Sequence, residues 1–150
     1  MGQSLSQLYV HLIFSTKGRE PLLLGTLRNQ THAYGASVLN NHGSAALKVG
    51  GTSDHVHALF RLSKNRALAE VVEEIKTRSS KWIKTQARGL GGFRWQSGYR
   101  GFSVSPGEVD SIVKYIEQQE AHHQATSFEE EYRRFLKAYE VEYDERFVWD

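Results

Sequence analysis

The chain has 150 residues, of which 39% are hydrophobic, and its formal net charge is +2. This composition excludes an intrinsically disordered chain and suits one compact domain with a real core. The absence of cysteine excludes disulfides and thiolate metal sites and fits a cytoplasmic location, and no secretory signal or apolar segment of about 20 residues suggests contact with a membrane.

The first half of the chain predicts a strand, a helix and a β-hairpin. Apolar, β-branched and aromatic residues fill the first segment and favour a central strand, and Pro21 suits the first position of a helix. A turn at 50–54 joins the next two strands as a hairpin. The elements expected here are a strand at Leu8–Phe14, a helix from Pro21 to about Leu39, and strands at Ala45–Gly51 and Val56–Leu62.

The second half predicts helices around a glycine-rich stretch that contains one short strand. The elements expected here are a helix at Ala67–Gln86, a strand at Phe102–Ser105, a helix from Val109 to about His123, and a charged helix at 128–139. The order β-α-β-β-α-β-α predicts an α+β fold, a mainly antiparallel sheet of the ferredoxin-like (RRM-like) kind with helices packed on it.

Charge is distributed unevenly along the chain. Residues 127–150 contain eight acidic and four basic residues, a net charge of −4, which leaves +6 for residues 1–126. We expect 1–126 to carry the function and 127–150 to be an acidic helical extension of the same domain, used for packing or dimerisation. The segment from residue 61 to residue 100 contains ten basic residues and only three acidic ones, all glutamates. This segment indicates either a polyanionic partner or a solvated basic helix.

His55 and His57 are two residues apart on a predicted strand. Alternate residues of a strand point the same way, so both imidazoles project from one face and could share a cation, while Val56 turns into the core. A His-x-His pattern also arises by chance, so the pair alone leaves a metal site and a structural role open.

Tyr115 and Gln119 are four residues apart on a predicted helix and therefore lie on one side of it. A tyrosine beside an apolar stripe is usually a boundary residue with a packed ring and a solvated hydroxyl. With His55 and His57, however, the Gln119 oxygen completes a ligand set suited to Mg²⁺ or Mn²⁺. Such an ion polarises a scissile phosphate, and Tyr115 would lie beside that phosphate as a nucleophile.

Three segments together carry a resemblance to a known family. They are Asp54-His55-Val56-His57, the run Gly-Tyr-Arg-Gly-Phe-Ser-Val-Ser at 98–105, and Tyr115-Ile116-Glu117-Gln118-Gln119. In this order and spacing they resemble the single-tyrosine HUH transposases of small bacterial insertion sequences. The segment at 11–17 is also similar to the first strand of that family, so the resemblance runs from about Tyr9 to His123.

This resemblance implies a role for each matching residue. His55 and His57 would be the paired metal ligands, Gln119 the third ligand and Tyr115 the nucleophile. The tyrosine of such enzymes attacks single-stranded DNA, forms a 5′-phosphotyrosine link and later rejoins the strand at a new junction. The resemblance also implies a homodimer that recognises DNA hairpins near element ends, in which the Tyr115 helix can act in trans.

Basic side chains supply the expected DNA contacts. The set comprises Lys76, Arg78, Lys81, Lys84 and Arg88 on the long helix, with Lys17, Arg19 and Arg100 elsewhere. Three alternatives stay open: a domesticated HUH endonuclease acting on repeated hairpins, another HUH nuclease such as a replication initiator, and a non-enzymatic ferredoxin-like nucleic-acid binder. The lone Tyr-x-x-x-Gln pattern disfavours the initiator, and the binder predicts no covalent product.

Overall fold

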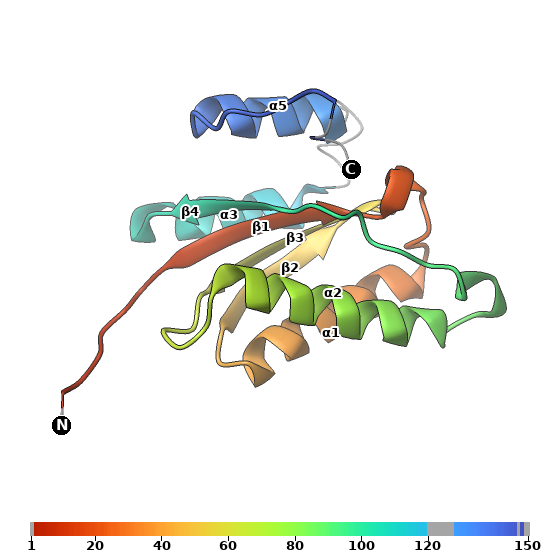
Figure 1. Cartoon of the computed structure of the whole chain (residues 1–150), viewed down its shortest axis with the longest axis horizontal. Coiled ribbons are helices and arrows are strands. Elements are labelled where there is room, and N and C mark those ends of the chain that lie inside the picture. Colours follow the sequence, from red (N-terminus) through yellow and green to blue (C-terminus); the bar gives the residue numbers. More distant parts are fainter. Residues whose placement is uncertain (1, 120–127, 147, 149–150) are drawn as a thin grey trace.

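The computed structural model describes residues 2–119, 128–146 and 148. Four strands form one antiparallel sheet in the order β2-β3-β1-β4, which confirms the predicted ferredoxin-like α+β fold (Figure 1). The elements are β1 (Tyr9–Ser15), α1 (Thr26–Asn41), β2 (Ala45–Gly51), β3 (His55–Arg61), α2 (Leu68–Lys84), β4 (Arg100–Val104), α3 (Val109–Glu117) and α5 (Phe128–Ala138), with short 3-10 turns at Lys17–Arg19, Arg88–Leu90 and Pro106–Glu108.

Two predicted helix bounds differ from the structure. The first helix begins at Thr26 and not at Pro21, because Leu23 N–H donates to Ser53 O at 2.9 Å and ties this segment to the β2–β3 turn. Gly25, with φ of 56°, then leads into the helix. The helix with Tyr115 ends at Glu117, and the rest of its predicted length, at 120–123, lies outside the described residues, as does the expected boundary between 126 and 127.

One face of the sheet packs against α1 and α2 and is closed by apolar side chains. Figure 1 shows both helices on the same side of the sheet, with α5 on the other side. Alternate residues of the two central strands form the strand half of this core: Val10, Leu12 and Phe14 from β1, and Val56, Ala58 and Phe60 from β3. Trp95 joins this core, and its Nε1 donates to Ser79 Oγ at 2.9 Å.

The opposite face is covered by α3 and α5. Ile116 of α3 packs on Leu59 of β3, and residues of α5 pack on Ile13 of β1 and Phe102 of β4. The apolar side of α5 therefore contacts the sheet, through Phe128, Tyr132, Leu136 and the partly buried Phe135 and Tyr139. Among the described residues, no helix has the length and hydropathy needed to cross a membrane.

Candidate active site

β3 places His55 and His57 on the face covered by α3 and α5. Their side chains are 1% and 0% exposed, and their ring centroids lie 5.1 Å apart. Val56 between them is buried in the core on the opposite face. The side-by-side placement expected from the strand period is therefore present in the fold.

The Nδ1 atoms of the two imidazoles are held by different partners. His55 Nδ1 lies 2.7 Å from a carboxylate oxygen of Asp54 and donates to it, which leaves the lone pair of His55 on Nε2. His57 Nδ1 lies 2.8 Å from Nε2 of His11, a fully buried residue of β1. Burial, reinforced by the charge of His57, lowers the pKa of His11 well below its usual value, so the neutral ring can donate or accept this bond.

The end of α3 brings Gln119 and Tyr115 to the histidines. Gln119 Oε1 lies 3.2 Å from His55 Nε2, and the Tyr115 ring centroid lies 5.8 Å from that of His57. This approach requires Gly50 of β2, because a Cβ there would lie 2.7 Å from Cγ2 of Ile116. Tyr115 and Gln119, paired by their helical spacing, therefore lie next to the two histidines that the strand period placed together.

The environment of Tyr115 keeps its phenol protonated in this arrangement. Burial raises the pKa of Tyr115 far above its usual value, and the charge and hydrogen bonding of Glu131 raise it further. Hydrogen bonding with Gln119 acts in the opposite direction but is a smaller cause. A phenol that is to act as a nucleophile therefore needs a changed environment around it.

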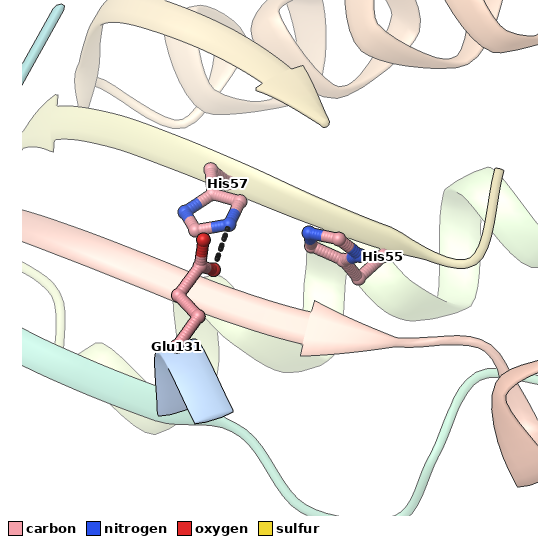
Figure 2. Close-up of side chains that lie close together, drawn as sticks. All are labelled: His55, His57 and Glu131. Carbon is pink, nitrogen blue, oxygen red and sulfur yellow. Dashed lines mark ion pairs between the residues drawn. The ribbon is translucent and has the colours of Figure 1, made fainter. Parts of the chain in front are cut away.

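α5 adds a carboxylate to the cluster that sequence reasoning missed. Glu131 is 2% exposed, and its Oε1 lies 3.2 Å from His57 Nε2 (Figure 2). The Phe128 ring, one turn earlier, lies 4.6 Å from the ring of His55. The sequence held one usable signal, since Glu131 stands beside the apolar stripe of its helix, where a carboxylate requires a buried partner.

The donor set at this position fits a divalent cation. Ligand atoms of His55, His57 and Glu131 all lie within 4.8 Å of one another, and the Gln119 oxygen lies against His55. Two imidazole nitrogens with carboxylate and amide oxygens suit ions such as Mn²⁺ or Mg²⁺. The three ligands expected from the sequence are therefore joined by a fourth candidate on a separate helix.

Three of the basic residues expected to contact DNA are engaged inside the protein. Lys76 Nζ donates to the carbonyls of Gln96 and Gly98 at 2.8 and 2.6 Å, and burial followed by the charge of Arg100 lowers the pKa of Lys76 to about 8. The Arg100 guanidinium lies 4.1 Å from the ring centroid of Tyr132, and burial lowers the pKa of Arg100 to about 10. Arg19 forms an ion pair with an acidic residue of α5, Glu129.

The other basic candidates are exposed. Arg78 pairs with Glu74 of the same helix at 2.7 Å. Four further side chains are exposed: Lys17, Lys81, Lys84 and Arg88. Lys81 and Lys84 belong to α2, which covers the face of the sheet opposite to His55 and His57. A DNA strand that contacts both α2 and the histidines must therefore pass around the edge of the sheet.

Comparison with known proteins identifies one family. A profile described as "Transposase IS200 like" matches residues 4–119. The ISDra2 transposase TnpA of Deinococcus radiodurans is 26% identical over 118 residues, which cover 75% of this chain and 84% of that protein.

Two solved structures share the fold. A provisionally assigned transposase from Deinococcus radiodurans R1 has a TM-score of 0.62 and 22% identity, with 79% of this chain and 96% of that chain covered. A REP-associated tyrosine transposase bound to a REP hairpin has a TM-score of 0.60 and 15% identity, with 96% and 93% covered.

Proposed function

The chain belongs to the IS200-like family of transposases, and on that basis we propose that it cuts and rejoins single-stranded DNA through a covalent link to Tyr115. The observation that supports this mechanism most directly is the convergence of Tyr115 and Gln119 with His55 and His57. These two pairs are about 60 residues apart in the chain and come from a helix end and a strand.

In the proposed reaction, the Tyr115 hydroxyl oxygen attacks the phosphorus of one phosphodiester. An oxygen–phosphorus bond to Tyr115 forms as the phenol loses its proton, and the bond from phosphorus to the 3′ oxygen breaks. The leaving 3′ oxygen takes up one proton, so the step releases no net proton. Bound Mg²⁺ or Mn²⁺ would stabilise the negative charge on the phosphate and on the leaving oxygen. Asp54 and His11 orient the two imidazoles, and the reverse attack by a 3′ hydroxyl rejoins the strand.

The proposed substrate is single-stranded DNA that carries a hairpin. The REP-associated tyrosine transposase with this fold was solved with a REP hairpin, which supports the same class of ligand for this chain. Exposed Lys17, Lys81, Lys84 and Arg88 are the proposed phosphate contacts. Lys76, Arg78, Arg19 and Arg100 would have to exchange their present partners to join them.

α5 must leave the cluster before a phosphate can reach it. Gln119 and both histidines are at most 1% exposed, and Phe128 and Glu131 occupy the space above them. We therefore propose that 127–150 is part of the same domain as 1–126 and that α5 controls access. A homodimer that exchanges the Tyr115 helix stays a prediction, since one chain already holds Tyr115 beside its own His57.

A covalent trapping assay tests the function. Wild-type protein incubated with a labelled hairpin oligonucleotide and Mn²⁺ should give a protein–DNA adduct that survives denaturation. Tyr115→Phe should abolish the adduct, His57→Ala and Gln119→Ala should weaken it strongly, and Tyr143→Phe in the exposed tail should leave it intact. An adduct that persists in Tyr115→Phe would refute the assignment, and tight binding with no adduct in wild type would favour a non-enzymatic binder.

Mixing two inactive variants tests the dimer. Tyr115→Phe and His57→Ala protein should together regain adduct formation if the tyrosine helix acts in trans. If the mixture stays inactive while each variant still binds the hairpin, the tyrosine acts in cis.

A further inference from the structure

A polar groove follows the outer edge of β2 and leads to the candidate active site. β2 is an edge strand of the sheet, so α1 and the end of α3 flank it and no further strand of the described chain pairs with it. Two adjoining cavities of about 400 Å³ each lie along this edge and share Asn29, His32, Lys48 and Val49. One of them is also lined by Gln119, the candidate metal ligand.

A bulge in β2 turns Lys48 toward the catalytic face. Ala46 is paired with Phe60 and Lys48 with Leu59, so Leu47 is an extra residue between them. Leu59 lies on the same face as the catalytic histidines, and Lys48 therefore lies there too. Lys48 Nζ lies 3.7 Å from a carboxylate oxygen of Glu117 on α3, two residues before Gln119.

α1 contributes a second cationic group and an unsatisfied ring nitrogen. Arg28 and His32 are four residues apart on α1 and line the same cavity. Among the described residues, His32 Nε2 is enclosed and has no hydrogen-bond partner. Burial, followed by the charge of Arg28 and smaller contributions that include Lys48, lowers the pKa of His32 to about 4. The charged side chains of the cavity are thus Arg28, Lys48 and Glu117, with a net charge of +1, and the cavity also holds a neutral imidazole with an unmet hydrogen bond.

We propose that this β2 groove holds the single-stranded segment of DNA next to the cleaved phosphodiester, with one phosphate bound between Arg28 and Lys48. The inference rests on the proposed function and names a binding site for its substrate. Each cavity has the volume of a small-ligand pocket, about 300–1,000 Å³. Small side chains, Ala33, Ala36 and Ala46, leave room along the outer cavity for the next nucleotide.

The groove has the charge and the direction that a strand requires. Its two cationic groups come from opposite walls, Arg28 on α1 and Lys48 on β2, so a phosphate between them would bridge the two elements. Because Gln119 lines the groove and lies against His55, a DNA strand held there would lie next to the histidines rather than on the far face of α2.

Binding of a hairpin with and without a single-stranded flank tests the groove. The test uses the full-length Tyr115→Phe protein, because this variant should form no covalent adduct. Fluorescence anisotropy then measures the Kd for each labelled hairpin. Arg28→Met and Lys48→Met should each weaken binding of the flanked hairpin roughly threefold to tenfold, the effect of one partly screened charge contact. Lys48→Arg should restore binding, and Arg66→Met, which removes an exposed arginine that pairs with Glu70, should have no effect.

Neutral methylphosphonates placed one at a time in the flank sharpen this test. At one position of the flank, the methylphosphonate should weaken binding to the Tyr115→Phe protein but should have no effect on binding to the same protein with Arg28→Met added. The slope of log Kd against log salt should also fall by about 0.7 in that variant. The proposal would be overturned if Arg28→Met and Lys48→Met bound the flanked hairpin as tightly as Arg66→Met does. It would also be overturned if these variants lost as much affinity for the hairpin without a flank as for the flanked hairpin.

The groove and the proposed function can fail separately. If protein that retains Tyr115 forms the covalent adduct while the groove variants bind normally, the function stands and the groove is refuted. If no adduct forms in any protein, the function fails, and the anisotropy data still decide whether the groove holds a strand.

Discussion

The two faces of the central sheet differ in what they bury. Beneath α1 and α2 the two central strands bury apolar side chains, among them Leu12, Ala58 and Phe60. Beneath α3 and α5 the same strands present buried titratable groups, His11, His55 and His57, and α5 adds Glu131. Because strand residues alternate, β1 and β3 serve both faces at once.

This difference shows how the fold can tolerate a buried polar cluster. Buried polar and charged groups destabilise a fold unless they find partners, and each of these side chains contacts another group of the cluster. Burial of apolar surface on the other face supplies the stability that the cluster does not. The face with the histidines is covered by α3 and by α5, a helix of 11 residues.

The largest expected effect comes from a cavity in the apolar face. Phe60→Ala should lower the free energy of unfolding by about 3–5 kcal/mol, because it empties space between the sheet and its helices. Leu136→Ala on α5 should lower it much less, since truncation there loosens only an 11-residue helix. Urea unfolding followed by the fluorescence of Trp82 and Trp95, both on the apolar face, measures the two values. Equal losses would show that both faces unfold as one unit.

Hydrogen exchange compares the same two regions without a substitution. The amides of α5 should exchange on the order of a hundredfold faster than those of β3, because the helix can open locally while the sheet stays folded. Phe128→Ala, which removes the ring beside His55, should speed exchange in α5 and leave β3 unchanged. Exchange of both elements at one rate would contradict the view that α5 controls access.

The hydrogen bond between His11 and His57 should have a smaller effect, on metal affinity. His11→Leu removes the partner of His57 Nδ1 and should weaken Mn²⁺ binding about 10- to 100-fold, the usual effect of losing such a support. His11→Gln offers an amide oxygen to the same nitrogen and should recover much of that affinity. Calorimetry gives the affinities, and ¹⁵N spectra of His57 report which of its two ring nitrogens carries the proton. Unchanged spectra and affinity in His11→Leu would leave His11 a packing residue.

Local periodicity predicted the parts of the site that lie within single elements. The strand period placed His55 and His57 on one face, and the helical spacing placed Tyr115 with Gln119. The hairpin and the order of elements likewise predicted the antiparallel sheet.

Contacts between distant segments could not be predicted in the same way. His11 stands in an apolar strand and shows its role only when β1 pairs with β3. Lys76 reads as an exposed basic residue until the loop with Gln96 and Gly98 folds over it. Pro21 suggested a helix start that is overridden by the hydrogen bond from Leu23 N–H to Ser53 O in the distant β2–β3 turn.

The smallest expected effect lies at the edge of β2, where the two faces meet. His32 should titrate at about 4 in NMR spectra of the folded protein, below its ordinary value of 6.5. Arg28→Met should raise this pKa only in part, because burial is the largest cause and the charge of Arg28 the second. A complete return to 6.5 would mean that the ring is solvated, which would contradict an enclosed groove.

The same shift has a definite sign for stability. Between pH 6.5 and about 4, His32 takes up a proton in the unfolded chain but not in the folded one. This residue therefore stabilises the folded state fully above pH 6.5, and that contribution is lost as the pH falls toward 4. His32→Gln should flatten this part of the pH dependence in urea unfolding experiments. Since a bound phosphate would favour the protonated ring, hairpin DNA should also raise the pKa of His32 in wild type and raise it less in Lys48→Met.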